Sequence, residues 1–349
     1  MLKSLAADSE FRHRIWSVYA LLAVMNVAAW LWAVTAFAGQ PVRLGIAAVV
    51  YGLGLRHAVD ADHIAAIDNV TRKFLQDGRR SASIGFWFAL GHSAVIFLAT
   101  AALVAAAGRL NHFMAFREIG GDVSASVSGV FLILVAAMNF CIFLTIVRTI
   151  RRARAGNAVE PAELDILFTG NGLFARIFRP LFGLISQPWH MGLLGLVFGL
   201  SFDTASEVAL FGVSATQTSH GVAFGEALVY PTLFAAGMSL LDTTDGVMMV
   251  GAYDWAVADP LRKLYYNMAI TLASIFVALF VGGVQLGALI VRWFGFGGVF
   301  ARAAVELTAD LNHLGIAIIA VFAIAWAASG LIWRFVGSDS LHSVSGTPS

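Results

Sequence analysis

Long apolar runs recur along most of the chain, and charged positions fall mainly between them. Five runs contain no Asp, Glu, Lys or Arg and exceed the roughly 20 residues that a helix needs to cross a bilayer. They are Ile15–Val42, Ser81–Gly108, Val123–Val147, Leu264–Val291 and Leu311–Trp333. Three further apolar runs are interrupted by charged residues, namely Leu44–Asn69, Trp189–Ser214 and Ala227–Ala252. The pattern predicts an all-α integral membrane protein with eight transmembrane helices.

The basic residues between these runs are unevenly distributed, and this asymmetry predicts the orientation of the helices. With the amino terminus inside, sixteen Lys and Arg residues fall in inner segments, five fall in outer loops, and Arg56 lies within the membrane. Both termini are therefore predicted to be cytoplasmic. The same pattern divides the chain into an amino-terminal half (1–147), a cytoplasmic linker loop (148–188) and a carboxy-terminal half (189–349).

The composition agrees with a multi-pass protein whose surroundings are the lipid bilayer. Hydrophobic residues make up 59% of the 349 positions and charged residues 12%, whereas soluble proteins carry about 25% charged residues. A net charge of +1, with no basic run that interleaves aromatic residues, predicts no nucleic-acid partner. The single cysteine, Cys141, cannot form a CxxC metal or redox site. None of the three lysines follows a glycine as in a Walker A sequence, so the chain has no ATPase motif.

The most polar of the apolar runs contains the stretch Gly52–Asn69, which reads GLGLRHAVDADHIAAIDN. It places two histidines, three aspartates and Arg56 in a segment long enough to cross a bilayer. Ionisable residues at membrane depth are costly and therefore indicate a functional site.

A continuous helix cannot present all of these side chains to one ion. At about 100° per residue, His57 and Asp60 fall on one stripe, His63 flanks the stripe, and Asp62 points largely away. We therefore expect either a break in the helix near Gly52–Arg56 or a division of the ligands between an ion and neighbouring helices. Broken helices are tolerated at membrane depth where they line a cavity.

Further candidate ligands lie on other predicted helices. His92 lies about ten residues from the cytoplasmic end of the third helix and His57 about twelve from that of the second, so both have a similar depth at about 1.5 Å per residue. Imidazole and carboxylate without thiolate suit Ni²⁺, Co²⁺, Zn²⁺ or Mn²⁺. Four carboxylates on the fifth and sixth helices need a cation or protons to offset their burial. They are Asp203 and Glu207 in SFDTASE, and Asp242 and Asp245 in GMSLLDTTDG.

The two halves show an internal similarity. FALGHS at Phe88–Ser93 corresponds to FAAGMS at Phe234–Ser239, and Gly54 precedes Asp62 by the same eight positions that separate Gly199 from Glu207. In the predicted topology the repeated pairs, helices 2–3 and 5–6, run in opposite directions, so we expect an inverted repeat, as in many secondary transporters. Recurring small residues that serve helix packing are the alternative explanation.

Four segments together resemble the signatures of the nickel/cobalt transporter (NiCoT) family. They are RHAVDADHI (56–64), ALGHS (89–93), LSFDTASE (200–207) and GMSLLDTTD (237–245). The resemblance implies eight helices, cytoplasmic termini and uptake of Ni²⁺ or Co²⁺ through the cytoplasmic membrane. The HxxxxDH core of the family corresponds to His57, Asp62 and His63. Ser201 and Ser206 depart from the Gly and Thr that are common in the family.

We therefore interpret the chain as a permease, not an enzyme, that imports Ni²⁺, Co²⁺ or both, driven by membrane potential or an ion gradient. The metal is the transported substrate, and no cofactor is expected. The expected metal ligands are His57, Asp62, His63 and His92. Residues expected along the ion pathway or behind the ligands are Asp60, Ser93, Asp203, Glu207, Asp242 and Asp245.

Three alternatives stay open at this point. An intramembrane metalloenzyme would commonly carry HExxH, which is absent from the sequence. A proton-coupled exporter of another divalent cation would use the carboxylates as a relay, and a membrane scaffold would use the polar residues only to hold helices together. The ligand types do not distinguish Ni²⁺ from Co²⁺.

Overall fold

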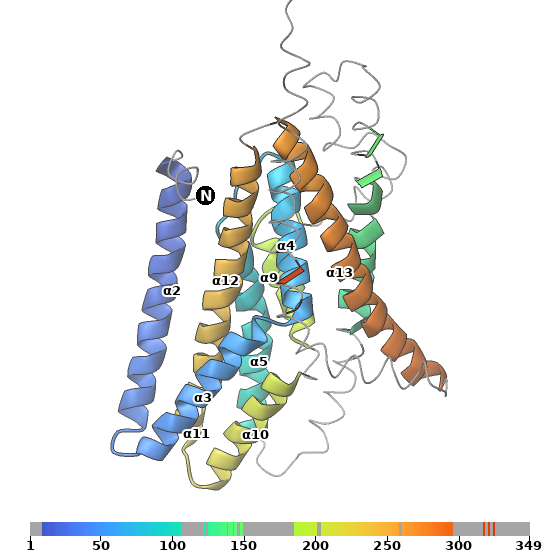
Figure 1. The fold of residues 1–349 in the computed structure, drawn as a ribbon. Coiled ribbons are helices and arrows are strands. Elements are labelled where there is room, and N and C mark those ends of the chain that lie inside the picture. The colour runs from blue at the N-terminus through green and yellow to red at the C-terminus, as the bar shows by residue number, and fades with distance from the viewer. Residues whose placement is uncertain are drawn as a thin grey trace, which may run out of the picture.

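A computed structural model describes residues 9–105, most of 122–148, and residues 185–200, 204–257 and 260–295, with a few single positions between 317 and 324 (Figure 1). The elements in these described ranges are all α-helices. In chain order they are α2 (Ser9–Ala36), α3 (Pro41–His57), α4 (Ala61–Gln76), α5 (Ile84–Ala105), α9 (His190–Phe198), α10 (Ala205–Ser219), α11 (Phe224–Ala227), α12 (Val229–Val257) and α13 (Pro260–Phe294).

Several of these helices have the length and composition of membrane spans. Within the described residues there are four such spans, and α3 with α4 forms a fifth that is bent by 51°. The four continuous spans are Ser9–Ala36, Ile84–Ala105, Phe224–Ala252 and Thr271–Phe294. The prediction of an all-helical, multi-pass protein is therefore confirmed. The eight-helix count stays a prediction, because most of 311–333 and of the linker 148–188 lies outside the described residues.

The outermost helices present apolar side chains to their surroundings. α2 and α13 lie on opposite sides of the bundle (Figure 1). Trp16 of α2 is 73% exposed and Phe276 of α13 is 65% exposed. In water such side chains would form a large apolar patch, whereas lipid tails solvate them.

Small residues allow the inner helices to approach closely. Gly91 of α5 lies against the backbone of Gly192 in α9, and Gly85 lies against the backbone of Asp242 in α12. A Cβ atom at Gly85 or Gly91 would overlap the facing carbonyl group. Such contacts are typical of membrane helices, which associate through close packing because lipid is as apolar as their side chains. They hold α5 against both α9 and α12.

The first polar stretch lies where a membrane span is interrupted. α3 ends at His57, residues 58–60 form a turn, and α4 begins at Ala61 after Asp60 in an extended conformation. The structure therefore contains the predicted break, but places it just after Gly52–Arg56. A second interruption separates α9 from α10, and residues 201–203 between them are not among those described.

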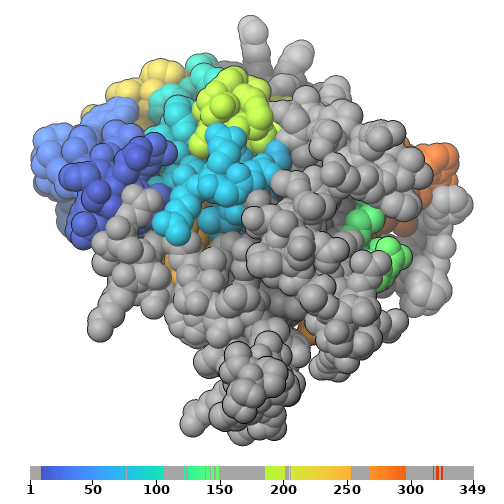
Figure 2. Space-filling model, turned by 90° about the horizontal axis from the view of Figure 1, so that it is seen from above, coloured from blue at the N-terminus to red at the C-terminus, as the bar shows by residue number. Residues whose placement is uncertain are grey.

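The far end of α4 and the start of α2 share a small apolar cluster. Seen from above, α2 (dark blue) lies beside α4 (cyan) (Figure 2). Phe11 of α2 is buried in a cluster with Ala82 and Val250, against which Leu75 of α4 also packs. This contact joins the amino-terminal helix to the end of the bundle that the distribution of Lys and Arg predicts to be cytoplasmic.

Candidate metal-binding site

Three histidines from three helices converge at the break between α3 and α4. The ring centroids of His57, His63 and His92 lie 4.6–4.9 Å from one another. Each side chain is at most 2% exposed. One ring nitrogen of each histidine can be chosen so that all three lie within 4.8 Å of one another, which is close enough to hold one metal ion. The sequence predicted that these three imidazoles share a depth, and the structure brings them together.

The interruption of the helix makes this convergence possible. His57 is the last residue of α3, and His63 is the third residue of α4. In one continuous helix these two side chains, six positions apart, would point about 120° apart around the helix axis. The 51° bend brings both imidazoles toward His92, which lies near the middle of α5.

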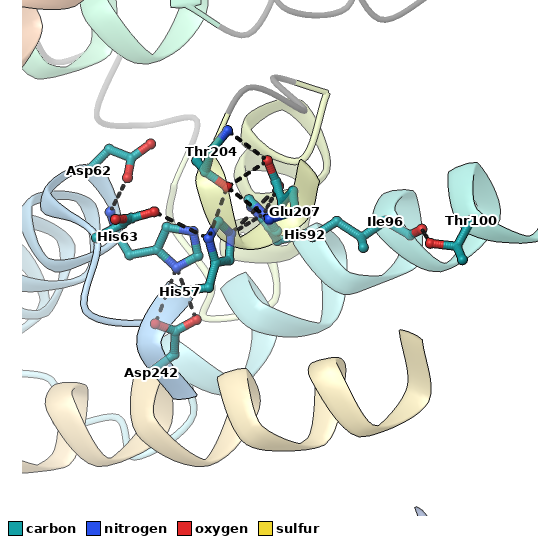
Figure 3. Close-up of polar contacts among 10 residues, drawn as sticks. His57, Asp62, His63, His92, Ile96, Thr100, Thr204, Glu207 and Asp242 are labelled. Atoms are coloured by element: carbon teal, nitrogen blue, oxygen red, sulfur yellow. Dashed lines mark hydrogen bonds and ion pairs between the residues drawn. The ribbon is translucent and has the colours of Figure 1, made fainter. Parts of the chain in front are cut away.

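Glu207 of α10 supplies a carboxylate to two of the histidines (Figure 3). His57 Nε2 and His92 Nε2 lie 2.9 Å apart. Glu207 Oε1 lies 3.1 Å from His92 Nε2 and 3.6 Å from His57 Nε2. Two imidazole nitrogens and one carboxylate oxygen thus point to a common position, which a divalent cation could occupy.

A helix cap holds Glu207 in place. Thr204 precedes α10, and its Oγ1 accepts a hydrogen bond from the backbone N–H of Glu207 while donating to Glu207 Oε2 at 2.9 Å. Glu207 Oε2 also accepts from the Thr204 backbone N–H at 3.4 Å. This capping box satisfies two otherwise unpaired amides at the helix start. Because Oε2 makes these bonds, Oε1 faces the histidines.

Two aspartates contact the Nδ1 atoms of His57 and His63 and fix the orientation of these imidazoles. Asp60 Oδ2 lies 3.2 Å from Nδ1 of His57, which leaves Nε2 of that ring directed at His92. Asp242 of α12 contacts Nδ1 of His63 at 3.2 and 3.3 Å. Carboxylates commonly hold metal-binding histidines in this way and increase their basicity. Within the described structure, His63 Nε2 has no hydrogen-bond partner, so this buried nitrogen is free to bind an ion.

The three imidazoles lie close enough together to hold a cation, and the sequence comparisons identify the kind of protein that carries them. The sequence profile of the NicO family, described as high-affinity nickel-transport protein, matches residues 43–332. The chain belongs to this family. The match covers most of the chain, including all three histidines, and confirms the resemblance that the signature segments indicated.

Individual relatives of this NicO family member are nickel and cobalt transport proteins. A "High-affinity nickel transport protein" of Cupriavidus necator is 48% identical over 93% of this chain and 92% of its own length. The "Nickel transporter NicT" of Mycobacterium tuberculosis is 39% identical over 92% of this chain and 89% of its own. The "Cobalt transport protein NhlF" of Rhodococcus rhodochrous is 37% identical over 88% of both chains. No solved structure matches the chain.

Asp62 is the predicted ligand of this NicO protein that the structure does not bring to the histidines. Its Oδ1 accepts the backbone N–H of His63 at 3.0 Å, and its side chain lies on the far side of that residue (Figure 3). Asp62 therefore caps the first turn of α4, where a carboxylate is favourable. Its direct coordination of an ion stays a prediction from the family signature.

The remaining predicted residues lie around the cluster or further along α12. Ser93 is buried beside His92, and its Oγ has no partner among the described residues. Asp245 follows Asp242 by one helical turn. Asp203 lies outside the residues that the structure describes.

The sequence reasoning assigned no role to two buried polar residues of α4, Asp68 and Thr71. Asp68 is 1% exposed and Thr71 is 0% exposed. A signal was present, because Asp68 lies on the same helical stripe as His57 and Asp60 and is ionisable at membrane depth. Thr71 has no comparable signal, since a threonine within a helix commonly bonds a carbonyl of its own helix.

Proposed function

We propose that this protein is a secondary transporter that imports Ni²⁺ or Co²⁺ across the cytoplasmic membrane, with His57, His63 and His92 as ligands at mid-membrane. The observation that carries the proposal is the convergence of three buried imidazoles at a helix break. Nitrogen ligands of this kind suit late first-row divalent metals. Cu⁺ prefers thiolate ligands, so a site of three imidazoles disfavours it.

Surrounding carboxylates offset the charge of the ion. Asp60, Glu207 and Asp242 are each at most 4% exposed and contact the histidines directly. A divalent cation in an apolar environment is costly unless opposite charges lie nearby. The same carboxylates, in the ion's absence, hold the imidazoles ready to bind, so the ion can replace its hydration shell without a large rearrangement.

The membrane potential is a sufficient energy source for import. Moving one elementary charge across 100 mV releases about 2.3 kcal/mol, so a divalent cation gains about 4.6 kcal/mol. Because about 1.4 kcal/mol corresponds to a factor of ten, this drives accumulation by more than a thousandfold. Both termini and the linker loop 148–188 are placed in the cytoplasm in this proposal, and the inverted halves alternate the access to the site.

The alternative of an intramembrane metalloenzyme has less support. The NicO family and the relatives named above are transport proteins, not enzymes. Export of another cation is distinguished by direction, because an exporter lowers the metal content of the cells that express it.

Uptake of radiolabelled Ni²⁺ by cells that express the full chain tests the proposal. We expect His57→Ala and His63→Ala to reduce uptake to the level of cells without the transporter, since each substitution removes one of the ligands. His220→Ala is the matched control, because His220 is an exposed residue that follows α10. Wild-type uptake by both variants at equal expression would contradict the proposal. Competition between Ni²⁺ and Co²⁺ in the same assay determines the preferred ion.

A further inference from the structure

Beyond the histidines, α4 and α12 enclose a second group of polar atoms. The helices run in the same direction (Figure 1), and two contacts define their register. His63 contacts Asp242, and further along, Gly246 faces Ile67 and Thr71, whose Oγ1 would lie 3.9 Å from a Cβ atom at the glycine. Asp68 of α4 and Asp245 of α12 therefore fall between these two levels.

Three oxygens at this level lack hydrogen-bond partners within the described part of the protein. They are Asp68 Oδ1, Thr71 Oγ1 and Asp245 Oδ2, and each atom is inaccessible to solvent. Asp68 and Thr71 are three positions apart on α4 and share one face of the helix. Asp245 interacts electrostatically with Asp68. Buried polar atoms without partners are uncommon and costly in proteins.

The other oxygen of Asp68 is already held by α13. Ser274 Oγ donates to Asp68 Oδ2 at 2.9 Å. The guanidinium of Arg72 donates to Ser274 Oγ, and to Thr271 Oγ1 at 2.7 Å. These bonds fix the Asp68 carboxylate so that Oδ1 remains directed away from the bonded hydroxyl. The nearby positive charge of Arg72 weakens the binding of any cation at Oδ1.

We infer that Asp68, Thr71 and Asp245 form a second position for the transported divalent cation, reached after the histidines. The inference rests on the proposed function, because the ion arrives from the histidine site. Asp68 lies five residues beyond His63, and Asp245 three residues beyond Asp242. At about 1.5 Å per residue, the second position is therefore about 5–8 Å nearer to the end of the bundle predicted to face the cytoplasm.

The chemistry of this second position suits release of the ion. Oxygen ligands bind Ni²⁺ and Co²⁺ less tightly than imidazole does, and prefer harder cations such as Mn²⁺. The ion thus passes from a nitrogen site that selects it to an oxygen site that holds it weakly.

Equilibrium binding of radiolabelled Ni²⁺ to the purified full-length protein tests the inference. We expect wild type to show one tight and one weaker class of site. Asp245→Asn should retain the tight class and lower the affinity of the weaker class at least tenfold, whereas His63→Ala should remove the tight class and retain the weaker one. Mn²⁺ bound to the His63→Ala variant should be detectable by electron paramagnetic resonance. The double variant that also carries Asp245→Asn should not bind this Mn²⁺.

A matched pair of threonines controls for the loss of a buried hydroxyl. Thr71→Val should weaken the second class several-fold. Thr100→Val should leave both classes unchanged, because the equally buried Thr100 donates to Ile96 O in its own helix at 2.8 Å, away from both sites (Figure 3). Retention of the tight class by Asp245→Asn and Thr71→Val also shows that these variants fold.

The remaining outcomes separate this inference from the proposed function. A single class of site that His63→Ala removes and Asp245→Asn leaves intact would overturn the second position but retain the histidine site. Unchanged Ni²⁺ binding by Asp245→Asn, with an altered pH dependence of uptake, would assign Asp245 to proton movement and also overturn the inference. Absence of any Ni²⁺ binding by the wild-type protein would contradict both.

Discussion

At the scale of single residues, the metal site depends on carboxylates that do not need to touch the ion. Asp60 holds Nδ1 of His57, and Asp242 holds Nδ1 of His63. Each contact selects one nitrogen of the imidazole for the carboxylate and leaves the other for the ion. We therefore expect the affinity of the proposed site to depend partly on residues one contact away from the ion.

Asp60→Asn tests this role. The amide retains the size of the side chain but loses its charge, so we expect Ni²⁺ affinity to fall by about 10–100-fold, as for other residues that orient metal-binding histidines. Helix α4 should be unaffected, because Asp60 makes no capping hydrogen bond with its side chain in the described structure. The measurement is Ni²⁺ binding to purified protein.

Asp77→Asn is the control for Asp60→Asn. Asp77 follows the other end of α4 and is exposed, so removal of its charge should leave the affinity unchanged. Equal affinities for Asp60→Asn and wild type would show that His57 is oriented without the carboxylate.

At the scale of elements, interrupted helices present the polar groups and glycines hold the helices together. The turn at 58–60 directs His57 and His63 to the same point, and the start of α10 directs Glu207 to it. The close contact of Gly85 with Asp242 sets the distance between α5, which carries His92, and α12, which orients His63. A change in helix spacing should therefore affect metal binding as well as stability.

Gly85→Ala should lower both stability and Ni²⁺ affinity. The added methyl group meets the Asp242 backbone, and overpacking of this kind costs about 1–3 kcal/mol. Thermal unfolding of the purified protein measures the first effect and Ni²⁺ binding the second.

Gly52→Ala is the matched control for Gly85→Ala. Gly52 also lies within a helix, but a Cβ atom there meets no other described atom within 4 Å. Alanine has the higher helix propensity by about 1 kcal/mol, so this variant should be at least as stable as wild type. Equal stability of the two variants would indicate that α5 and α12 can separate without cost.

At the scale of the whole molecule, the proposed energy source is the membrane potential. The bundle exposes apolar side chains on α2 and α13, so the polar residues of the site lie inside a lipid-solvated shell. Charge that crosses this shell responds to the membrane potential.

Proteoliposomes with a potassium diffusion potential test the dependence on voltage. An inside-negative potential of about 100 mV should increase Ni²⁺ accumulation at equilibrium by more than a thousandfold, because a divalent cation gains about 4.6 kcal/mol. Reversal of the potential should suppress accumulation. Accumulation that is independent of voltage but follows a pH gradient would instead indicate exchange for protons.

Much of this architecture could be predicted from the order of residues alone. Apolar runs of about 20 residues predict spanning helices, because backbone groups in lipid must bond within their own helix. The sequence predicts His57, His63 and His92 as ligands because ionisable residues at membrane depth carry a high cost, and the structure brings these three buried imidazoles together. The angular spacing of the polar residues predicted either a break in the first polar helix or a division of its ligands between an ion and neighbouring helices, and the structure contains a break at residues 58–60.

Only the tertiary structure decided which of these groups meet. It placed Glu207 between two imidazoles, paired His63 with Asp242, and turned Asp62 toward its own backbone. It also left buried oxygens of Asp68, Thr71 and Asp245 without hydrogen-bond partners among the described residues. Helical periodicity determines the direction in which a side chain leaves the axis of its own helix. The partner that it meets depends on the distance and register between helices. Glycine contacts such as Gly85 with Asp242 establish that distance and register.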